Sequence, residues 1–495
     1  MANLKSCETI SNLFQRTQII QKQLNAFTAL QNEEILKNQL ADKTESKSKL
    51  HGKLIAVKDN FCTKDLPTTC CSRMLEPFKP KYNATVVQRT IDAGAVVLGK
   101  TNMDEFGMGS GSIDSIFGPV KSLWRSGLVK YKLNGLPLLN QEDFKIQTDA
   151  IDEGDWCIAG GSSGGSAVAV SSNLCFASLG SDTGGSLRIP GAWCGLPTLK
   201  PSYGLFSRHG LIPLVNSLDV PGMFARTFDD LIDYFHVLRG VDLLDSTSQE
   251  LSSQELIDDS QVPKLVIGIP QEYYCEDMSD EVIEAWGQVA DLLEQEGFKV
   301  IPVSLPHTPY SITCYQVLNP CEVASNMSRY DGIEYGYRSA EMASTEALFA
   351  SVRHHGFNDV VKGRILAGNY FLLREHYDEY FEQALKVRRL ITEDFKASFE
   401  KVDLLLTPVT LTDAPSFKQF SSSDNRTQTA KNDYCTQPVN LAGIPAASIP
   451  VKLSRKSLPL SLQIIGAYGQ DMKVLSLCKW LENRIHFPQP EIIWE

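Results

Sequence analysis

Two segments rich in glycine and serine constrain what this chain can fold into more than any other feature. Residues 160–166 read GGSSGGS, and residues 180–190 read GSDTGGSLRIP. Glycine loses more backbone entropy on ordering than any other residue, so such loops are costly unless the backbone must approach another group closely. A turn of this kind presents several N–H groups beside a hydroxyl, as a serine nucleophile with an oxyanion hole requires. The sequence therefore predicts a serine-based catalytic centre.

An apolar stretch upstream ends in a lysine. Residues 52–60 read GKLIAVKDN, and a buried strand over residues 55–57 would carry Lys58 into the interior. Burial lowers the pKa of lysine, and a neutral lysine can accept a proton from a serine hydroxyl. The 8 histidines are scattered and form no HExxH or triad motif. We therefore predict Lys58, rather than a histidine, as the catalytic base.

Lys58, Ser162 and Ser186 occur in an order, and the two serines at a spacing, that resemble the amidase signature family. Members of that family hydrolyse amides with a Ser-Ser-Lys triad. The resemblance implies that Ser186 is the nucleophile, that Ser162 relays its proton to a neutral Lys58, and that the peptide bond at Ser162 is cis.

The same resemblance implies an oxyanion hole. It would be formed by the backbone N–H groups of Thr183, Gly184, Gly185 and Ser186. It also implies the amidase-signature fold, an α/β architecture in which a large mixed central β-sheet is covered by helices on both faces.

The hydrophobic periodicity independently favours an α/β fold with a largely internal sheet. The predicted strands are residues 55–57, 95–98, 265–269, 299–303, 403–406 and 446–451, and the predicted helices are residues 84–93, 226–239, 280–296 and 369–400. Residues 1–50 are predicted to be an N-terminal segment, helical over 1–45, and residues 51–495 to be the amidase domain. Residues 122–155 are polar and irregular, and we predict an inserted surface loop there, since loops tolerate insertions.

Two other motifs suggest different chemistry. Residues 161–165 fit GxSxG, the nucleophile elbow of α/β-hydrolases, which would make Ser163 the nucleophile and require an acid and a histidine downstream. That interpretation leaves Lys58 and Ser186 without a role. Residues 94–101 fit the P-loop pattern GxxxxGK[ST], but their four middle residues are apolar and β-prone, so a strand would lie inside the motif. We interpret it as a chance match.

The C-terminal half carries the substrate prediction. Residues 315–332, 361–365 and 432–443 resemble the A subunits of glutamyl-tRNA(Gln) amidotransferases, a branch of the amidase signature family. The resemblance implies that Arg364 holds the α-carboxylate of glutamine, Asp433 its α-ammonium, and that Tyr315 contacts the substrate. A free amino acid requires one cation and one anion, and arginine binds carboxylate in a bidentate way. A stand-alone amidase acting on another amide is the alternative, and it would be expected to lack the Arg364 and Asp433 pair.

The resemblance also implies partners and a compartment. We expect a heterotrimer with B and C subunits, contact with Glu-tRNA(Gln) mainly through the B subunit, no cofactor or metal in this chain, and ATP and Mg²⁺ used by the complex in a partner subunit. The net charge of −12 fits this division, because nucleic-acid affinity depends on phosphate neutralisation. No membrane segment is expected, since the longest charge-free stretch is crowded with glycine and serine. A mitochondrial location is implied by the resemblance; the N-terminus fits a presequence weakly and an ordinary amphipathic helix equally well.

Overall fold

The core of the molecule is an 11-stranded sheet. A computed structural model describes residues 7–41, 48–130, 154–251, 255–340 and 343–494. The strand order across the sheet is β1-β3-β2-β5-β7-β6-β11-β12-β10-β8-β9. Their bounds are β1 (Phe27–Leu30), β2 (Leu54–Lys58), β3 (Val96–Thr101), β5 (Ala177–Asp182), β6 (Thr198–Lys200), β7 (Val220–Ala225), β8 (Val266–Pro270), β9 (Lys299–Val303), β10 (Leu404–Pro408), β11 (Ala446–Leu453) and β12 (Pro459–Gly466).

The sheet is mixed, as predicted. β2 runs parallel to both β3 and β5, and β8 runs parallel to both β9 and β10. The central strands β5, β7, β6, β11, β12 and β10 pair in antiparallel fashion. A separate small ribbon joins β4 (Val129–Lys130) to β13 (Glu491–Ile492), near the C-terminal end of the described chain.

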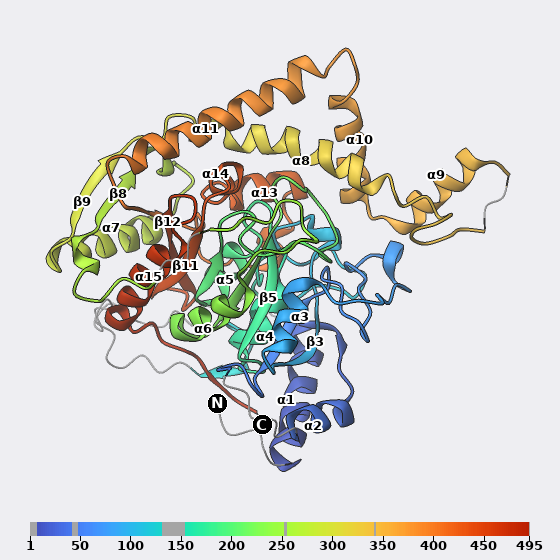
Figure 1. Cartoon of the computed structure of the whole chain (residues 1–495), viewed down its shortest axis with the longest axis horizontal. Coiled ribbons are helices and arrows are strands. Elements are labelled where there is room, and N and C mark those ends of the chain that lie inside the picture. The colour runs from blue at the N-terminus through green and yellow to red at the C-terminus, as the bar shows by residue number, and fades with distance from the viewer. Residues whose placement is uncertain (1–6, 42–47, 131–153, 252–254, 341–342, 495) are drawn as a thin grey trace.

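Helices surround this sheet (Figure 1). Their bounds are α1 (Cys7–Leu24), α2 (Glu33–Ala41), α3 (Thr85–Asp92), α4 (Gly164–Ser171), α5 (Arg188–Cys194), α6 (Phe228–Leu238), α7 (Asp280–Gln295), α8 (Ser311–Met327), α9 (Thr345–Gly356), α10 (Asp359–Phe371), α11 (Gln383–Phe399), α12 (Phe417–Phe420), α13 (Asn425–Asn432), α14 (Gln437–Ala442) and α15 (Asp471–Ile485).

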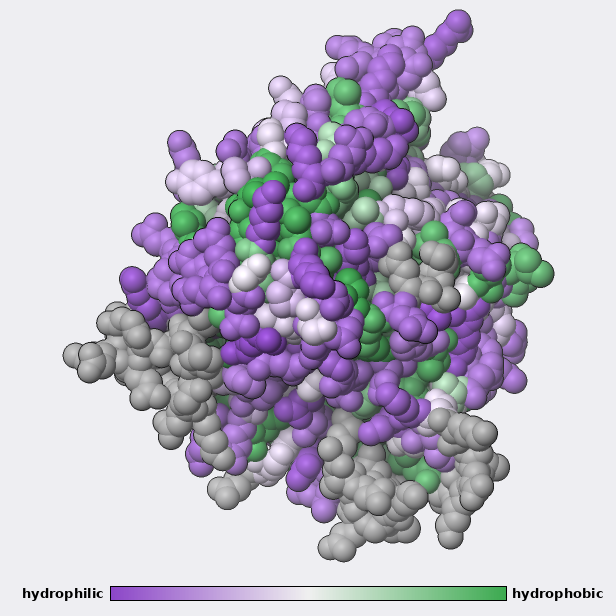
Figure 2. All heavy atoms as spheres, turned by 60° about the vertical axis from the view of Figure 1, so that its left-hand side comes forward, coloured by the Kyte–Doolittle hydropathy of each residue, from purple (hydrophilic) through white to green (hydrophobic). Residues whose placement is uncertain are grey.

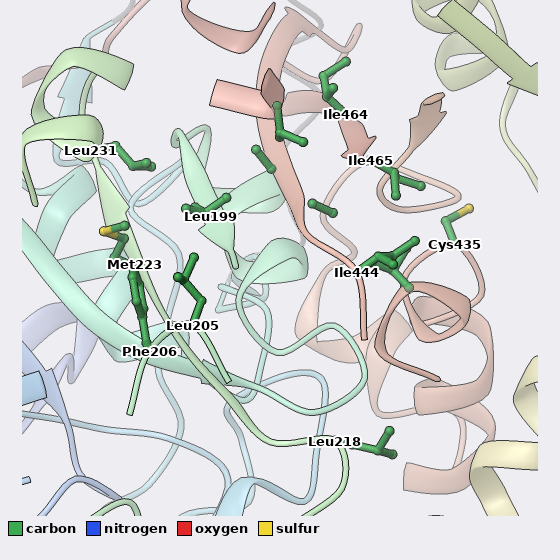
Figure 3. Packing of buried hydrophobic residues seen from close by; sticks show 14 of the residues in the cluster. Leu199, Leu205, Phe206, Leu218, Met223, Leu231, Cys435, Ile444, Ile464 and Ile465 are labelled. Carbon is green, nitrogen blue, oxygen red and sulfur yellow. The ribbon is translucent and has the colours of Figure 1, made fainter. Parts of the chain in front are cut away.

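Both faces of the central part of the sheet are buried, as β2 illustrates. Successive side chains of a strand point to opposite faces. Leu54 and Ala56 belong to a cluster with apolar side chains of α1 and α4, whereas Ile55 and Val57 belong to a second, larger cluster that includes residues of α3 and α6. A strand buried on both sides reads as a continuous apolar run rather than an alternating one, as β2 does. Figure 3 shows part of the larger cluster.

Most predicted elements are confirmed, and two are corrected. The predicted N-terminal helical segment contains α1 and α2 but also β1, which pairs with β3 at the edge of the sheet. The predicted helix over 369–400 is interrupted: α10 ends at Phe371 and α11 begins at Gln383, after a π-helical turn over Asp378–Glu382. A long helical periodicity continues across such an interruption, so the pattern alone did not locate it.

The predicted insertion at 122–155 is described only at its two ends. Residues 131–153 lie outside the described part of the chain. Leu123 and Trp124 are buried, and the Trp124 indole N–H donates to the Cys194 carbonyl at 2.9 Å. The first residues of the predicted surface loop therefore belong to the core, because these two apolar side chains anchor an otherwise polar stretch.

A helical layer formed by α8, α10 and α11 lies over one end of the sheet (Figure 1). α8 and α10 approach each other closely at Gly368, where a Cβ atom would lie 1.9 Å from the Pro320 carbonyl oxygen. Arg364 lies one turn before Gly368 on the same helix, so this contact fixes the position of Arg364 along α10 relative to α8.

We expect Gly368→Ala to destabilise the protein by about 1–3 kcal/mol, because the methyl group overlaps backbone atoms of α8. The matched control is Gly363→Ala on the same helix, where nothing lies within 4 Å of an added Cβ. That control is expected to stabilise the protein by up to about 1 kcal/mol through helix propensity. Thermal or denaturant unfolding of both variants measures the difference, and equal effects would contradict the close packing of α8 on α10.

Hydrophilic side chains dominate the face of the molecule in Figure 2, with hydrophobic ones gathered in smaller patches. Among the described residues, no helix is both long and apolar enough to cross a bilayer.

Candidate active site

Lys58 ends β2 and is fully buried. Its ammonium nitrogen donates to the hydroxyl oxygens of Ser162 at 2.8 Å, Ser163 at 2.8 Å and Ser181 at 3.0 Å. The structure thus brings the predicted base into contact with the first predicted serine, across a wide separation in sequence.

The surroundings of Lys58 favour its neutral form. Burial lowers its pKa from 10.5 to about 8, although the carboxylates of Asp104, Asp182 and Asp219 act in the opposite direction. A lysine with this pKa is neutral in a substantial fraction of molecules at mildly alkaline pH, as a general base must be.

The first glycine- and serine-rich segment forms a tight loop that leads into α4. The peptide bond between Gly161 and Ser162 is cis, as the family resemblance predicts. Gly160 has φ of +86°, and a Cβ there would lie 2.7 Å from the Pro190 Cα. The Ser163 N–H donates to the Ser186 carbonyl at 3.2 Å. The two segments predicted from sequence therefore pack directly against each other.

The GxSxG alternative does not match this geometry. The Ser163 hydroxyl is fully buried, accepts from Lys58 and donates to the Ser181 carbonyl at 3.1 Å. A nucleophile elbow instead presents its serine at the surface of a turn.

The second segment follows β5 and presents Ser186, which is partly exposed, whereas Ser162 is buried. In the part of the chain that the structure describes, the N–H groups of Thr183, Gly184, Gly185 and Ser186 donate to no protein acceptor. Such unpaired donors at a turn can stabilise an oxyanion. The hydroxyls of Ser162 and Ser186 are not joined by a direct hydrogen bond among these described residues.

A buried ion pair holds this loop. The Asp182 carboxylate accepts from Arg188 Nε at 3.1 Å and Nη2 at 3.0 Å, and from the Leu187 N–H at 3.0 Å. Burial alone would raise the pKa of Asp182, but the charge and hydrogen bonds of Arg188 outweigh it and lower that pKa. The ion pair closes the turn that contains residues 183–186 and so fixes the direction of its free N–H groups.

Tyr315, Arg364 and Asp433 come from α8, α10 and the C-terminal end of α13, and Tyr315 lies between the other two: it lines a pocket with Arg364 and shares a contact at Gly184 with Asp433. A Cβ on Gly184 would lie 3.1 Å from the Tyr315 hydroxyl and 3.1 Å from Asp433 Oδ2. A pocket of 460 Å³ is lined by Tyr315, Arg364 and other residues of these helices. Gly184 is thus the contact point between the serine loop and two of the predicted substrate residues, Tyr315 and Asp433.

The electrostatics of Asp433 fit a site for a cation. Burial raises its pKa to about 7, and nearby Asp182 adds to this effect. Its protein partner is the Gln437 amide, which donates to Oδ2 at 3.2 Å. A ligand ammonium at this carboxylate would restore its charged form.

Several site residues were not predicted from the sequence. Asn319 forms hydrogen bonds with both Arg364 and Tyr315. Asn425 accepts a hydrogen bond from Arg364 at 3.4 Å. Ser181 accepts one from Lys58. Asp104 accepts from backbone N–H groups of the neighbouring turn and lies against Gly161. The sequence carried no signal for Asn319, because the helix that places it one turn after Tyr315 was not predicted.

The P-loop pattern at 94–101 is a chance match. Residues 96–101 form β3, and Lys100 is fully buried, donating to the Phe61 carbonyl at 2.7 Å and to the Thr68 hydroxyl at 2.8 Å. A phosphate could not reach it. Within the described ranges, no group of three or more histidine, cysteine, aspartate or glutamate side chains could hold a metal ion.

Comparisons with known proteins identify the family of this chain. A family model described as Amidase matches residues 8–129 and 152–475. The chain therefore belongs to the amidase family, and the match begins at residue 8, within the predicted N-terminal segment of residues 1–50. The match omits 130–151, which lie within the predicted insertion.

Within this family, the chain is similar to proteins described as the A subunit of the mitochondrial glutamyl-tRNA(Gln) amidotransferase. The chain is 52% identical to the protein so named in Aedes aegypti, over 94% of this chain and 91% of that protein. It is 50% identical to the protein of the same name in Homo sapiens, over 97% and 90% of the two chains.

Solved structures share the fold. The crystal structure of the glutamyl-tRNA(Gln) amidotransferase A subunit from Thermotoga maritima has a TM-score of 0.76 and 31% identity, and it matches 99% of this chain and 96% of its own. A 6-aminohexanoate cyclic dimer hydrolase has a TM-score of 0.77, with 98% and 94% of the two chains covered, at 19% identity. The latter similarity concerns the fold alone.

Proposed function

We propose that this chain is the glutaminase subunit of a glutamyl-tRNA(Gln) amidotransferase. It hydrolyses glutamine to glutamate and supplies ammonia for the conversion of Glu-tRNA(Gln) to Gln-tRNA(Gln). The observation that carries the proposal is the position of Gly184, which lies in the predicted oxyanion loop and touches both Tyr315 and Asp433. The names of the similar proteins support the same function.

The reaction begins with proton transfer. Neutral Lys58 accepts a proton from Ser162, which accepts the proton of Ser186 as the Ser186 oxygen attacks the side-chain amide carbon of glutamine. The N–H groups of residues 183–186 stabilise the oxyanion that forms. The proton then returns to the leaving nitrogen, and ammonia departs. Water hydrolyses the resulting ester, which releases glutamate and regenerates the Ser186 hydroxyl.

Substrate recognition falls to residues of α8, α10 and the C-terminal end of α13. Arg364 binds the α-carboxylate, Asp433 binds the α-ammonium, and Tyr315 closes the pocket against Gly184. The two charged groups of an amino acid share one carbon atom, so their binding residues must be neighbours. Burial and Asp182 raise the pKa of Asp433, and Arg364 lowers it, so the charge of Arg364 acts on this carboxylate.

The remaining steps belong to partners. We place ATP, Mg²⁺ and the activation of glutamyl-tRNA in a B subunit, with a C subunit completing a heterotrimer, and we assign the complex to the mitochondrion because the similar proteins carry that location in their names. This chain then requires no cofactor of its own.

The direct test is glutamate release from glutamine by the purified full chain, alone and with its candidate B and C partners. Serine-dependent release that rises when partners and glutamyl-tRNA are added would support the proposal. Absence of glutamine turnover in both settings, with hydrolysis of other amides, would indicate a stand-alone amidase instead.

We expect Arg364→Ala to raise the KM for glutamine by about 10- to 100-fold, because a hydrogen-bonded charge pair with the α-carboxylate is lost. Hydrolysis of a neutral ester should change little. The control is Lys362→Ala on the same helix, which removes a cation that pairs with the exposed Asp359. Unchanged glutamine kinetics for Arg364→Ala would contradict the assignment of this residue.

A further inference from the structure

Asn319 connects two of the residues that would bind the substrate. It lies on α8 one turn after Tyr315 and is 1% exposed. Arg364 Nη1 donates to its Oδ1 at 3.0 Å, and its Nδ2 donates to the Tyr315 hydroxyl oxygen at 2.9 Å. One buried amide therefore touches both a cation and a hydroxyl of the same pocket.

The direction of these hydrogen bonds is fixed by chemistry. A guanidinium can only donate, so the oxygen of the Asn319 amide must face Arg364. The amide nitrogen then faces Tyr315 and can only donate. The Tyr315 oxygen is thus used as an acceptor, and its own proton must point to another group.

That proton has no acceptor in the described part of the chain. Burial raises the pKa of Tyr315, so the hydroxyl stays protonated. A buried donor without a partner is unfavourable, and a ligand oxygen would relieve this cost. Since the hydroxyl lies against Gly184 and Tyr315 lines the pocket with Arg364, a ligand in the pocket can supply that oxygen.

We infer that Asn319 is a positioning residue: because its amide donates to the Tyr315 oxygen, the Tyr315 hydroxyl directs its proton toward the substrate carboxylate. This inference rests on the proposed function. A carboxylate has two oxygens, and it can accept from Arg364 and from Tyr315 at once. The α-ammonium then lies at Asp433, which shares the contact at Gly184. Asn319 thereby selects substrates that carry a carboxylate, without touching them itself.

The test is Asn319→Asp in the full chain assembled with its partner subunits. Aspartate keeps the size and an acceptor for Arg364, but it has no N–H group. The Tyr315 hydroxyl then donates to the new carboxylate and no longer to the substrate. We expect the KM for glutamine to rise about 10- to 100-fold while kcat changes less than about twofold.

Three substrates separate this role from structural damage. Glutaric acid monoamide keeps the carboxylate and lacks the ammonium, so its kcat/KM should fall as that of glutamine does. 4-Aminobutanamide keeps the ammonium and lacks the carboxylate, so its kcat/KM should be unchanged. Equal losses for all three substrates would overturn the inference.

Two further variants complete the design. Asn326→Asp alters a buried asparagine of the same helix, whose amide donates to the Leu214 carbonyl at 3.0 Å, and it should leave all three KM values unchanged. In a Tyr315→Phe background, Asn319→Asp should change the KM for glutamine much less than in wild type. A rise of the same size in that background would mean that Asn319 acts through Arg364 alone, which overturns the proton-direction argument.

The outcomes also distinguish the inference from the proposed function. A wild-type complex that neither hydrolyses nor binds glutamine would overturn both. Normal wild-type glutamine turnover with an unaffected Asn319→Asp variant would overturn the inference and leave the proposed function standing.

Discussion

Ser186→Ala is expected to reduce glutamine hydrolysis by at least about 10⁴-fold, because removal of a nucleophile in a serine-based centre leaves only binding and oxyanion stabilisation. Ser186 is the partly exposed serine of the cluster, beside four unpaired N–H groups, whereas Ser162 and Ser163 are buried against Lys58. Glutamate release by the assembled complex measures the loss. Calorimetric binding of glutamine should persist, since Tyr315 and Arg364 are untouched.

The matched control is Ser172→Ala. Ser172 follows α4, is fully buried, and its hydroxyl has no hydrogen-bond partner in the described structure. Its replacement should leave kcat and KM unchanged. If Ser186→Ala kept full activity and Ser163→Ala lost it, Ser163 would be the nucleophile and the GxSxG interpretation would be correct.

The positions of the candidate catalytic residues were predictable because each belongs to a short pattern with a local physical meaning. The apolar run of β2 predicted that Lys58 would be buried, and the glycine-rich loops predicted exposed N–H groups beside serines. In the structure Lys58 donates a hydrogen bond to Ser162, and the Ser163 N–H donates one to the Ser186 carbonyl. The catalytic roles of these residues remain predictions that the Ser186 and Lys58 experiments test.

The helical layer was less predictable, and Pro320 shows why. A proline inside a helix removes a backbone donor and ordinarily argues against a helix, yet it lies within α8. The helix was not predicted, so the one-turn spacing of Tyr315 and Asn319 had no structural meaning in the sequence. The link from Asn319 to Arg364 further depends on the close contact of α8 with α10 at Gly368, which only tertiary packing determines.

Features that depend on tertiary pairing were missed for a related reason. β1 has four residues between two helices, and its place in the sheet comes from pairing with β3. Ser181 gives no signal in sequence beyond its membership of a glycine-rich run, although it is one of three serines that contact Lys58.

The pKa of Lys58 predicts that activity depends strongly on pH. Only neutral Lys58 can accept a proton, and burial lowers its pKa to about 8. We therefore expect kcat/KM to rise with pH through about 8 and to level off above it. Asp433, with a pKa of about 7, must be ionised to bind an ammonium and would add a second rise with glutamine. Glutaric acid monoamide, which has no ammonium, isolates the step that belongs to Lys58.

Lys58→Arg should lower kcat by about 10²- to 10⁴-fold, because arginine keeps the charge and cannot serve as a base. Raising the pH should not restore its activity. The matched control is Lys200→Met: Lys200 is also fully buried, with a pKa lowered to about 7, but its ammonium donates to the Pro201 carbonyl at 2.9 Å. If the rise of kcat/KM near pH 8 were still present in Lys58→Arg but absent from Lys200→Met, the proton acceptor would be Lys200. The proposed proton relay through Ser162 would then be wrong.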